Sequence, residues 1–208
     1  MITVTLILLA TCTAETNAQE NALWIEAEAY HAQAGSVGPD RPPFGSRGAC
    51  LGSNWAAGKG HFVVYRIRLD RPIVAAALHL RYARLPESDS QFDLFRDGKP
   101  AAQPLKLEST AGWGHLRDDE WRYATVPLGD LAPGWHELKL VSLADRNNTN
   151  LDGFFLAPSS FRPPNKRADI ETFPQPPLRR AANTPGPQWV DPSLELDDFQ
   201  PTADDWYY

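Results

Sequence analysis

The sequence predicts an all-β protein: an antiparallel β-sandwich of the jelly-roll type, followed by a Pro-rich extended C-terminal tail. Three observations support this prediction. Short segments alternate apolar and polar residues with a period of two, as strands with one buried face do. Glycine, proline and Asp-Gly turn signals separate these segments. No segment combines a long helical periodicity with helix caps.

The composition limits the classes of partner. The chain has 208 residues, of which 42% are hydrophobic, enough for one domain with a real core and additional segments. Its net charge of −6 argues against nucleic acid or an anionic membrane surface as the partner. The seven tryptophans are many for this length. Tryptophans outside a core often mark a binding surface.

Residues 1–18 are predicted to be a signal peptide. Ile2 to Ala10 form an apolar run that is too short to span a bilayer, and Ala14 or Ala18 offers a cleavage point. We therefore expect a secreted, periplasmic or cell-surface protein without a transmembrane segment after the signal. Cys50 is then left without an internal partner, and we expect a small buried residue there.

A single β-domain is predicted over residues 23–158. Its first strand is LWIEAEAY, residues 23–30, and its last is LDGFFLA, residues 151–157. The strands expected between them cover residues 61–69, 77–84, 91–95, 121–128 and 135–143. Asp97-Gly98 predicts a hairpin turn. Trp121 and Trp135 begin strands, so we expect both in the core.

The character of the chain changes in residues 159–208, the predicted tail. This segment holds nine prolines and only scattered apolar residues, so it cannot build a core of its own. It is either disordered or laid along a surface. We favour packing on its own domain or on a partner chain, because aromatic residues recur along it.

Two carboxylates stand on one side of the first predicted strand. Glu26 and Glu28 are about 6–7 Å apart there, and like charges at this spacing repel. They could form a solvated face, act as a catalytic acid/base pair, pair with an arginine such as Arg81 or Arg66, or bind calcium. Calcium prefers oxygen ligands from distant segments, and Asp152 on the last strand is a candidate third ligand because first and last strands are often neighbours.

The order of motifs resembles that of β-sandwich carbohydrate-binding modules of families 6, 35 and 36. The motifs are the strand IEAE, the loop and strand GSNWAAGKGHFVVYRI, the strand RYA, the DG hairpin, the loop TAGW with a second Trp downstream, the strand GWHEL and the final NLD. Together they cover residues 23–158, about two-thirds of the chain.

The resemblance implies a jelly-roll sandwich with a structural calcium ion on Glu26, Glu28 and Asp152. It also implies a ligand site in loops at one end of the sandwich, on Trp55, Trp113 and Asn150. Aromatic rings stack on the C–H faces of sugars, and amides bond their hydroxyls. Two of these residues have a named alternative role: Trp55 could pack its loop or face a partner, and Asn150 could shape its turn.

Catalysis is not expected. The histidines are scattered, and no nucleophile, zinc or nucleotide-binding motif occurs. The favoured interpretation is a non-catalytic, secreted, calcium-stabilised domain that binds a glycan or polysaccharide. The alternative is a structural subunit of an extracellular or cell-surface assembly, with residues 159–208 gripping a partner chain as an extended peptide.

Overall fold

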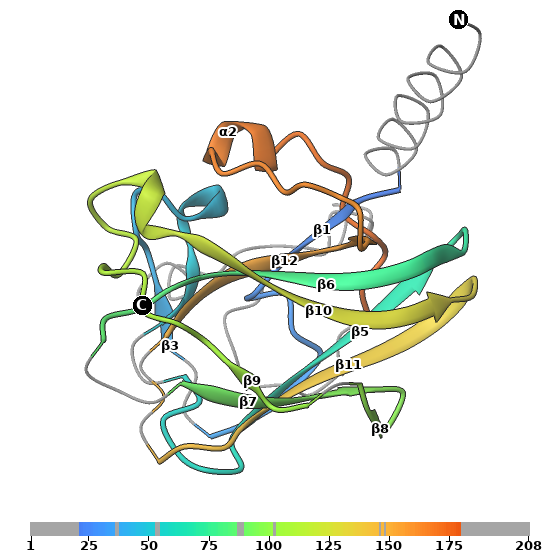
Figure 1. Ribbon diagram of the computed structural model, residues 1–208, viewed down its shortest axis with the longest axis horizontal. Coiled ribbons are helices and arrows are strands. Elements are labelled where there is room, and N and C mark those ends of the chain that lie inside the picture. The colour runs from blue at the N-terminus through green and yellow to red at the C-terminus, as the bar shows by residue number, and fades with distance from the viewer. Residues whose placement is uncertain are drawn as a thin grey trace, which may run out of the picture.

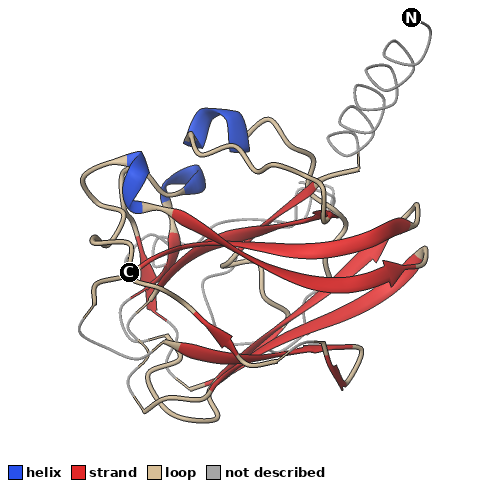
Figure 2. Cartoon of the chain, viewed as in Figure 1, coloured by secondary structure: helices blue, strands red, loops and turns tan. Residues whose placement is uncertain are grey.

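The structure, a computed structural model, describes residues 21–35, 38–52, 55–86, 90–101, 103–145, 147 and 149–179. Two antiparallel sheets face each other across one core (Figure 1). The predicted antiparallel β-sandwich is confirmed, and strands dominate the described chain (Figure 2). No helix in these ranges is long and apolar enough to cross a membrane.

Sheet A has the strand order β10-β6-β12-β4-β3, with β1 also paired to β12. Its strands are β1 (Leu23–Glu26), β3 (Gly38–Asp40), β4 (Cys50–Gly52), β6 (Ile73–Ala83), β10 (Arg122–Leu131) and β12 (Asn150–Pro158). Sheet B has the order β2-β5-β11-β7-β8, with β9 paired to β7. Its strands are β2 (Ala32–Ala34), β5 (Phe62–Leu69), β7 (Gln91–Arg96), β8 (Lys99–Pro100), β9 (Leu105–Lys106) and β11 (Gly134–Ser142). Short helices are η1 (Ser46–Gly48), η2 (Asp118–Glu120) and α2 (Arg167–Ile170).

The first and last strands of the sandwich are neighbours, as predicted. Strand β1 runs antiparallel to β12, with Ile25 opposite Phe154. However, β1 ends at Glu26, and Glu28 lies in the turn that follows, so the predicted strand over residues 23–30 is too long. The turn forms because the Ala27 N–H bonds to the carbonyl of Asp152, after which the Ala29 N–H bonds back to that of Glu26.

The core fills the space between the sheets. The inward positions of β5 alternate with outward ones, so Tyr65 and Ile67 are buried while Arg66 is exposed. In the hairpin between β7 and β8, Asp97 and Gly98 have φ values of 51° and 76°, as a turn with two left-handed residues requires.

Three predictions about single residues were tested by this core. Cys50 is a free, fully buried cysteine, as expected. Trp121 is also buried as expected, at 3% exposure. Trp135 is 51% exposed, so its predicted core position is wrong. The reason is register: Trp135 pairs with the outward-facing Arg68, whereas the inward positions of β11 fall on Leu138 and Leu140.

Residues 159–179 form a strap, which lies over the outer face of sheet A and includes α2 (Figure 1). This face is apolar, with Trp24 and Phe155 pointing away from the main core. Phe161, Ile170 and Phe173 of the strap cover it in an aromatic cluster, in which the rings of Phe155 and Phe161 are 5.0 Å apart. The strap therefore supplies the second layer that this face of the sheet needs.

The end of the strap crosses from sheet A to sheet B. The Trp24 N–H of β1 bonds to the carbonyl of Pro174, and the Arg68 N–H of β5 bonds to that of Pro177. Leu178 forms an antiparallel bridge with Ile67. This part of the predicted tail thus lies on its own domain, and residues 180–208 lie outside the described residues.

Candidate functional site

The three acids predicted to bind calcium lie in one neighbourhood at the β1–β12 pair. Glu26 ends β1, Glu28 follows in the turn, and Asp152 is fully buried in β12. Ser46 of η1 connects two of them. Its hydroxyl donates to Oε1 of Glu26 at 2.9 Å, and its backbone N–H donates to Oδ1 of Asp152 at 2.6 Å.

Burial makes the charged forms of these acids unfavourable. It raises the pKa of Glu26 from 4.5 to about 7, and the charge of Asp152 adds to the rise. The pKa of Glu28 is raised well above its ordinary value, first by burial and then by the charge of Glu26. The charge of Asp152 therefore disfavours the ionised forms of both glutamates, whereas the charge of Arg81 lowers the pKa of Asp152 itself.

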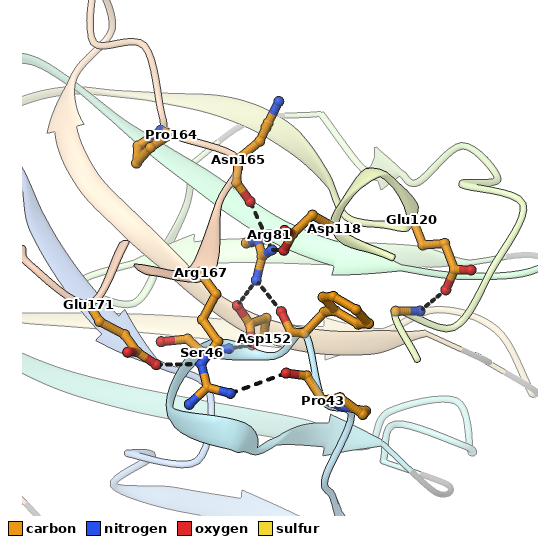
Figure 3. A network of polar contacts seen from close by, with 12 residues as sticks. Pro43, Ser46, Arg81, Asp118, Glu120, Asp152, Pro164, Asn165, Arg167 and Glu171 are labelled. Carbon is orange, nitrogen blue, oxygen red and sulfur yellow. Dashed lines mark hydrogen bonds and ion pairs between the residues drawn. The ribbon is translucent and has the colours of Figure 1, made fainter. Parts of the chain in front are cut away.

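Arg81 of β6 holds Asp152 (Figure 3). Its Nη1 donates to Oδ2 of Asp152 at 2.6 Å, and neither side chain has any exposed surface. The expectation that Arg81 or Arg66 is the alternative partner of the glutamates is therefore not met: Arg66 pairs with Glu137. Glu26 instead has Arg47, at 3.2 Å.

The fit of this cluster to a cation is uneven. Oε2 of Glu26 and Oε1 of Glu28 are buried without a hydrogen-bond partner, and such orphaned carboxylate oxygens are what a bound cation would satisfy. Both oxygens of Asp152, by contrast, already accept hydrogen bonds. Within the described ranges, no group of three acidic, His or Cys side chains converges on one point. Two of the three predicted ligands thus fit, and the calcium site stays a prediction.

Two of the predicted ligand-binding residues meet at one end of sheet A. Asn150 begins β12, and its Nδ2 donates to the carbonyl of Trp113 at 2.8 Å. Trp113 is half-buried in the loop between β9 and β10. The amide of Asn150 thereby fixes the position of the loop that carries this aromatic ring.

Trp55 lies close to the same strand end but is buried, at 2% exposure. Its ring stacks on Phe92 with 5.2 Å between centroids, and its Nε1 donates to the carbonyl of Thr149. This burial favours loop packing, the structural alternative for Trp55, over contact with a ligand. The small residues around it allow the loop to fold back over the end of the core, and Trp55 supports the backbone next to Asn150.

The structure adds a polar pair that the sequence did not reveal. Nε2 of His115 lies 3.1 Å from Oδ2 of Asp40, which ends β3. Asp40 is also close to Asn150, because a Cβ on Gly52 would lie 2.6 Å from Cβ of Asp40 and 2.8 Å from Oδ1 of Asn150. Only the pairing of β3 with β4 and of β4 with β12 brings these residues together, and no sequence motif signals it.

The loop that carries Trp113 is held by a buried carboxylate. Oε2 of Glu120 accepts hydrogen bonds from the backbone N–H groups of Gly114 at 2.8 Å and His115 at 3.1 Å. Gly114 has a φ of +77°, and a Cβ there would lie 2.2 Å from the ring of Trp121. The loop is therefore rigid on its inner side, so the ring of Trp113 is presented from a fixed backbone.

Comparisons with known proteins identify the fold. A family 35 carbohydrate-binding module from Clostridium thermocellum superposes with a TM-score of 0.54 at 15% identity, over 65% of this chain and 96% of that one. A family 35 module solved with a glucuronic acid-containing disaccharide gives 0.50 at 19% identity, over 66% and 98%. The C-terminal family 6 module of a laminarinase from Zobellia galactanivorans gives 0.50 at 19% identity, over 66% and 99%. Neither a family model nor a curated protein matches the sequence. The described sandwich thus has the fold of family 6 and family 35 carbohydrate-binding modules.

Proposed function

We propose that this protein is a non-catalytic, exported carbohydrate-binding domain whose ligand site is the loop end around Trp113 and Asn150. The observation that carries the proposal is the hydrogen bond from Asn150 to the carbonyl of Trp113, beside the Asp40–His115 pair. An aromatic ring next to hydrogen-bonding groups on a rigid loop is the arrangement that sugars require. The fold supports the same ligand class by analogy.

Glycan binding is tested by titration calorimetry against a glycan panel that includes a glucuronic acid-containing disaccharide. We expect Trp113→Ala to weaken binding at least about tenfold, because an aromatic contact contributes about 0.5–1.5 kcal/mol beyond its buried area. The matched control is Trp135→Ala, a half-exposed Trp at the far end of sheet B. Binding that is unchanged in Trp113→Ala, or no binding to any glycan, would overturn the proposal.

We also propose that Glu26 and Glu28 hold a structural calcium ion, with Asp152 contributing negative charge beside them. The orphaned buried oxygens of both glutamates support this proposal. Calorimetry with calcium and with a chelator tests it. We expect saturable binding and a melting temperature that falls when calcium is removed, and both effects should vanish in Glu28→Gln. A melting temperature that is insensitive to calcium and chelator contradicts the proposal.

Export and a protein partner are the two remaining expectations. Export rests on residues 1–18, which lie outside the described residues. A protein partner gripped by residues 159–208 has less support, because the apolar side chains of residues 159–179 are used on the outer face of sheet A. We therefore do not propose that the strap binds another protein.

A further inference from the structure

The outer face of sheet B differs from that of sheet A. It carries an aromatic and apolar group that is only partly buried, together with several cations. Trp135 is 51% exposed, Phe62, Phe95 and Val141 are half-buried, and Nζ of Lys139 lies 4.1 Å above the ring of Phe62. The pairing places on this face Ala32, Ala34, Phe62, Val64, Arg66, Arg68, Gln91, Asp93, Phe95, Pro100, Lys106, Trp135, Glu137, Lys139, Val141 and Arg179.

This face carries a small excess of cations on an acidic protein. Beside five cations (Arg66, Arg68, Lys106, Lys139 and Arg179) lie four acids: Asp93 and Glu137 on the strands, Asp70 at 3.8 Å from Arg68, and Asp97, which accepts from the Glu137 N–H. The whole chain, by contrast, has a net charge of −6. Such a face attracts a ligand that combines negative charge with aromatic or apolar groups.

The described part of the chain ends beside this face, and the segment that follows in sequence is such a ligand. The strap pairs with the edge of β5 up to Arg179, whose N–H bonds to the carbonyl of Arg66. Beyond this point the same edge of β5 is occupied, because the N–H of His31 bonds to the carbonyl of Val64 and β2 pairs with residues 62–64. The described chain ends at Arg179, at the β5 edge of sheet B and beside its outer face.

We propose that the outer face of sheet B binds residues 180–208 of the same chain. This segment has six acidic residues and one Arg, and its aromatics are Trp189, Phe199, Trp206, Tyr207 and Tyr208. Fully extended, it spans roughly 95 Å, and the strands from β5 to β8 cover only about 15 Å. The segment is thus long enough to cross the face, its acidic residues complement the cations there, and its aromatic residues suit the apolar side chains.

Covalent attachment makes even a weak contact effective. A short tether gives an effective concentration on the order of 1 mM. A contact with an intrinsic Kd of about 0.1 mM would therefore be mostly formed, and an external acidic ligand would have to displace it. Salt should weaken the contact, because the charges lie at the surface.

Carbodiimide coupling of the full-length chain tests the proposal, since it joins a Lys to a carboxylate only where the two touch. We expect intramolecular links from the acids of residues 180–208 to Lys139 and Lys106 at about five times the yield of links to Lys166, which precedes α2 on the other sheet. The charge reversal Arg68→Glu should lower the Lys139 yield about threefold, as should 1 M salt. Arg122→Glu, on the exposed part of β10, is the matched control.

Three outcomes would overturn the proposal. One is an equal yield at all three lysines, which indicates random encounters. Another is the absence of links to this face. The third is coupling found only between two chains, which would assign the face to a second copy of the protein.

Discussion

Arg81 connects four segments that are distant in the sequence. Besides its pair with Asp152, its guanidinium donates to the carbonyls of Asn165 (Figure 3) and Phe44. It also lies 4.9 Å from the ring centroid of Trp121. A buried cation is tolerated only where anions and carbonyls surround it. The site loops and the strap therefore share one electrostatic anchor.

Replacing Arg81 by Met is expected to lower the free energy of unfolding by about 3–5 kcal/mol, because it leaves the buried charge of Asp152 without a partner. Arg66→Met, which breaks the more exposed pair with Glu137, should cost at most about 1 kcal/mol. Urea unfolding measures both. Equal costs for the two variants would show that Arg81 is not the anchor.

The glutamate cluster predicts an unusual pH dependence for the calcium-free protein. Glu26 titrates near 4.5 when unfolded and near 7 when folded, so the folded state holds the extra proton between these values. The extra proton on Glu26 stabilises the folded state in full below pH 4.5. This stabilisation, on the order of 3 kcal/mol, is lost as the pH rises to about 7.

The effect is isolated by comparing the wild type with Glu26→Gln in chelator from pH 4.5 to 8. The Gln variant keeps the neutral form at every pH, so its advantage over the wild type should grow with pH. Calcium should reverse the trend, since it favours the ionised carboxylates. A difference between the two proteins that is constant across this range would contradict the assignment.

At the scale of elements, the loop of Trp113 depends on Glu120. Glu120→Ala leaves the backbone N–H groups of Gly114 and His115 without their acceptor. We expect faster amide exchange across residues 114–116 and about a tenfold loss of glycan affinity, because a loosened loop must be ordered again on binding. Glu120→Gln keeps an acceptor oxygen and is the control. If Glu120→Ala binds as tightly as Glu120→Gln, the loop is fixed by other contacts.

The long strands were predictable because one or both faces are buried along their whole length. Both β5 and β12 appear close to their predicted bounds. The short strands β2, β3 and β4 were not predicted, since three residues carry no period and these strands exist only through pairing with β5 and β12. The turn at Glu28 was missed for the same reason: the Ala27 N–H donates to the carbonyl of Asp152, which lies far along the chain.

At the scale of the whole molecule, the strap is part of the fold. Phe161 is 2% exposed and contacts Phe155 on sheet A. We expect Phe161→Ala to cost about 3–5 kcal/mol while unfolding remains a single transition by fluorescence and circular dichroism. Leu116→Ala, at a side chain that is 76% exposed, should change stability by less than about 0.5 kcal/mol. Separate transitions for strap and sandwich would contradict this view.

The resemblance to carbohydrate-binding modules placed Trp113 and Asn150 at one end of the sandwich, and the structure brings these two residues into contact there. The burial of Trp55, the Asp40–His115 pair and the commitment of Asp152 to Arg81 could not be predicted, since each depends on side-chain directions in contacts between distant segments.

Cys50 gives this fold a kinetic probe. Its thiol is fully buried at the pairing of β3 with β4, and burial raises its pKa far above the ordinary value. Thiolate, the reactive form toward alkylating reagents, is therefore scarce and shielded in the native protein. Any labelling of Cys50 must wait until β4 detaches from its neighbours, so the alkylation rate reports how often this edge of the sandwich opens.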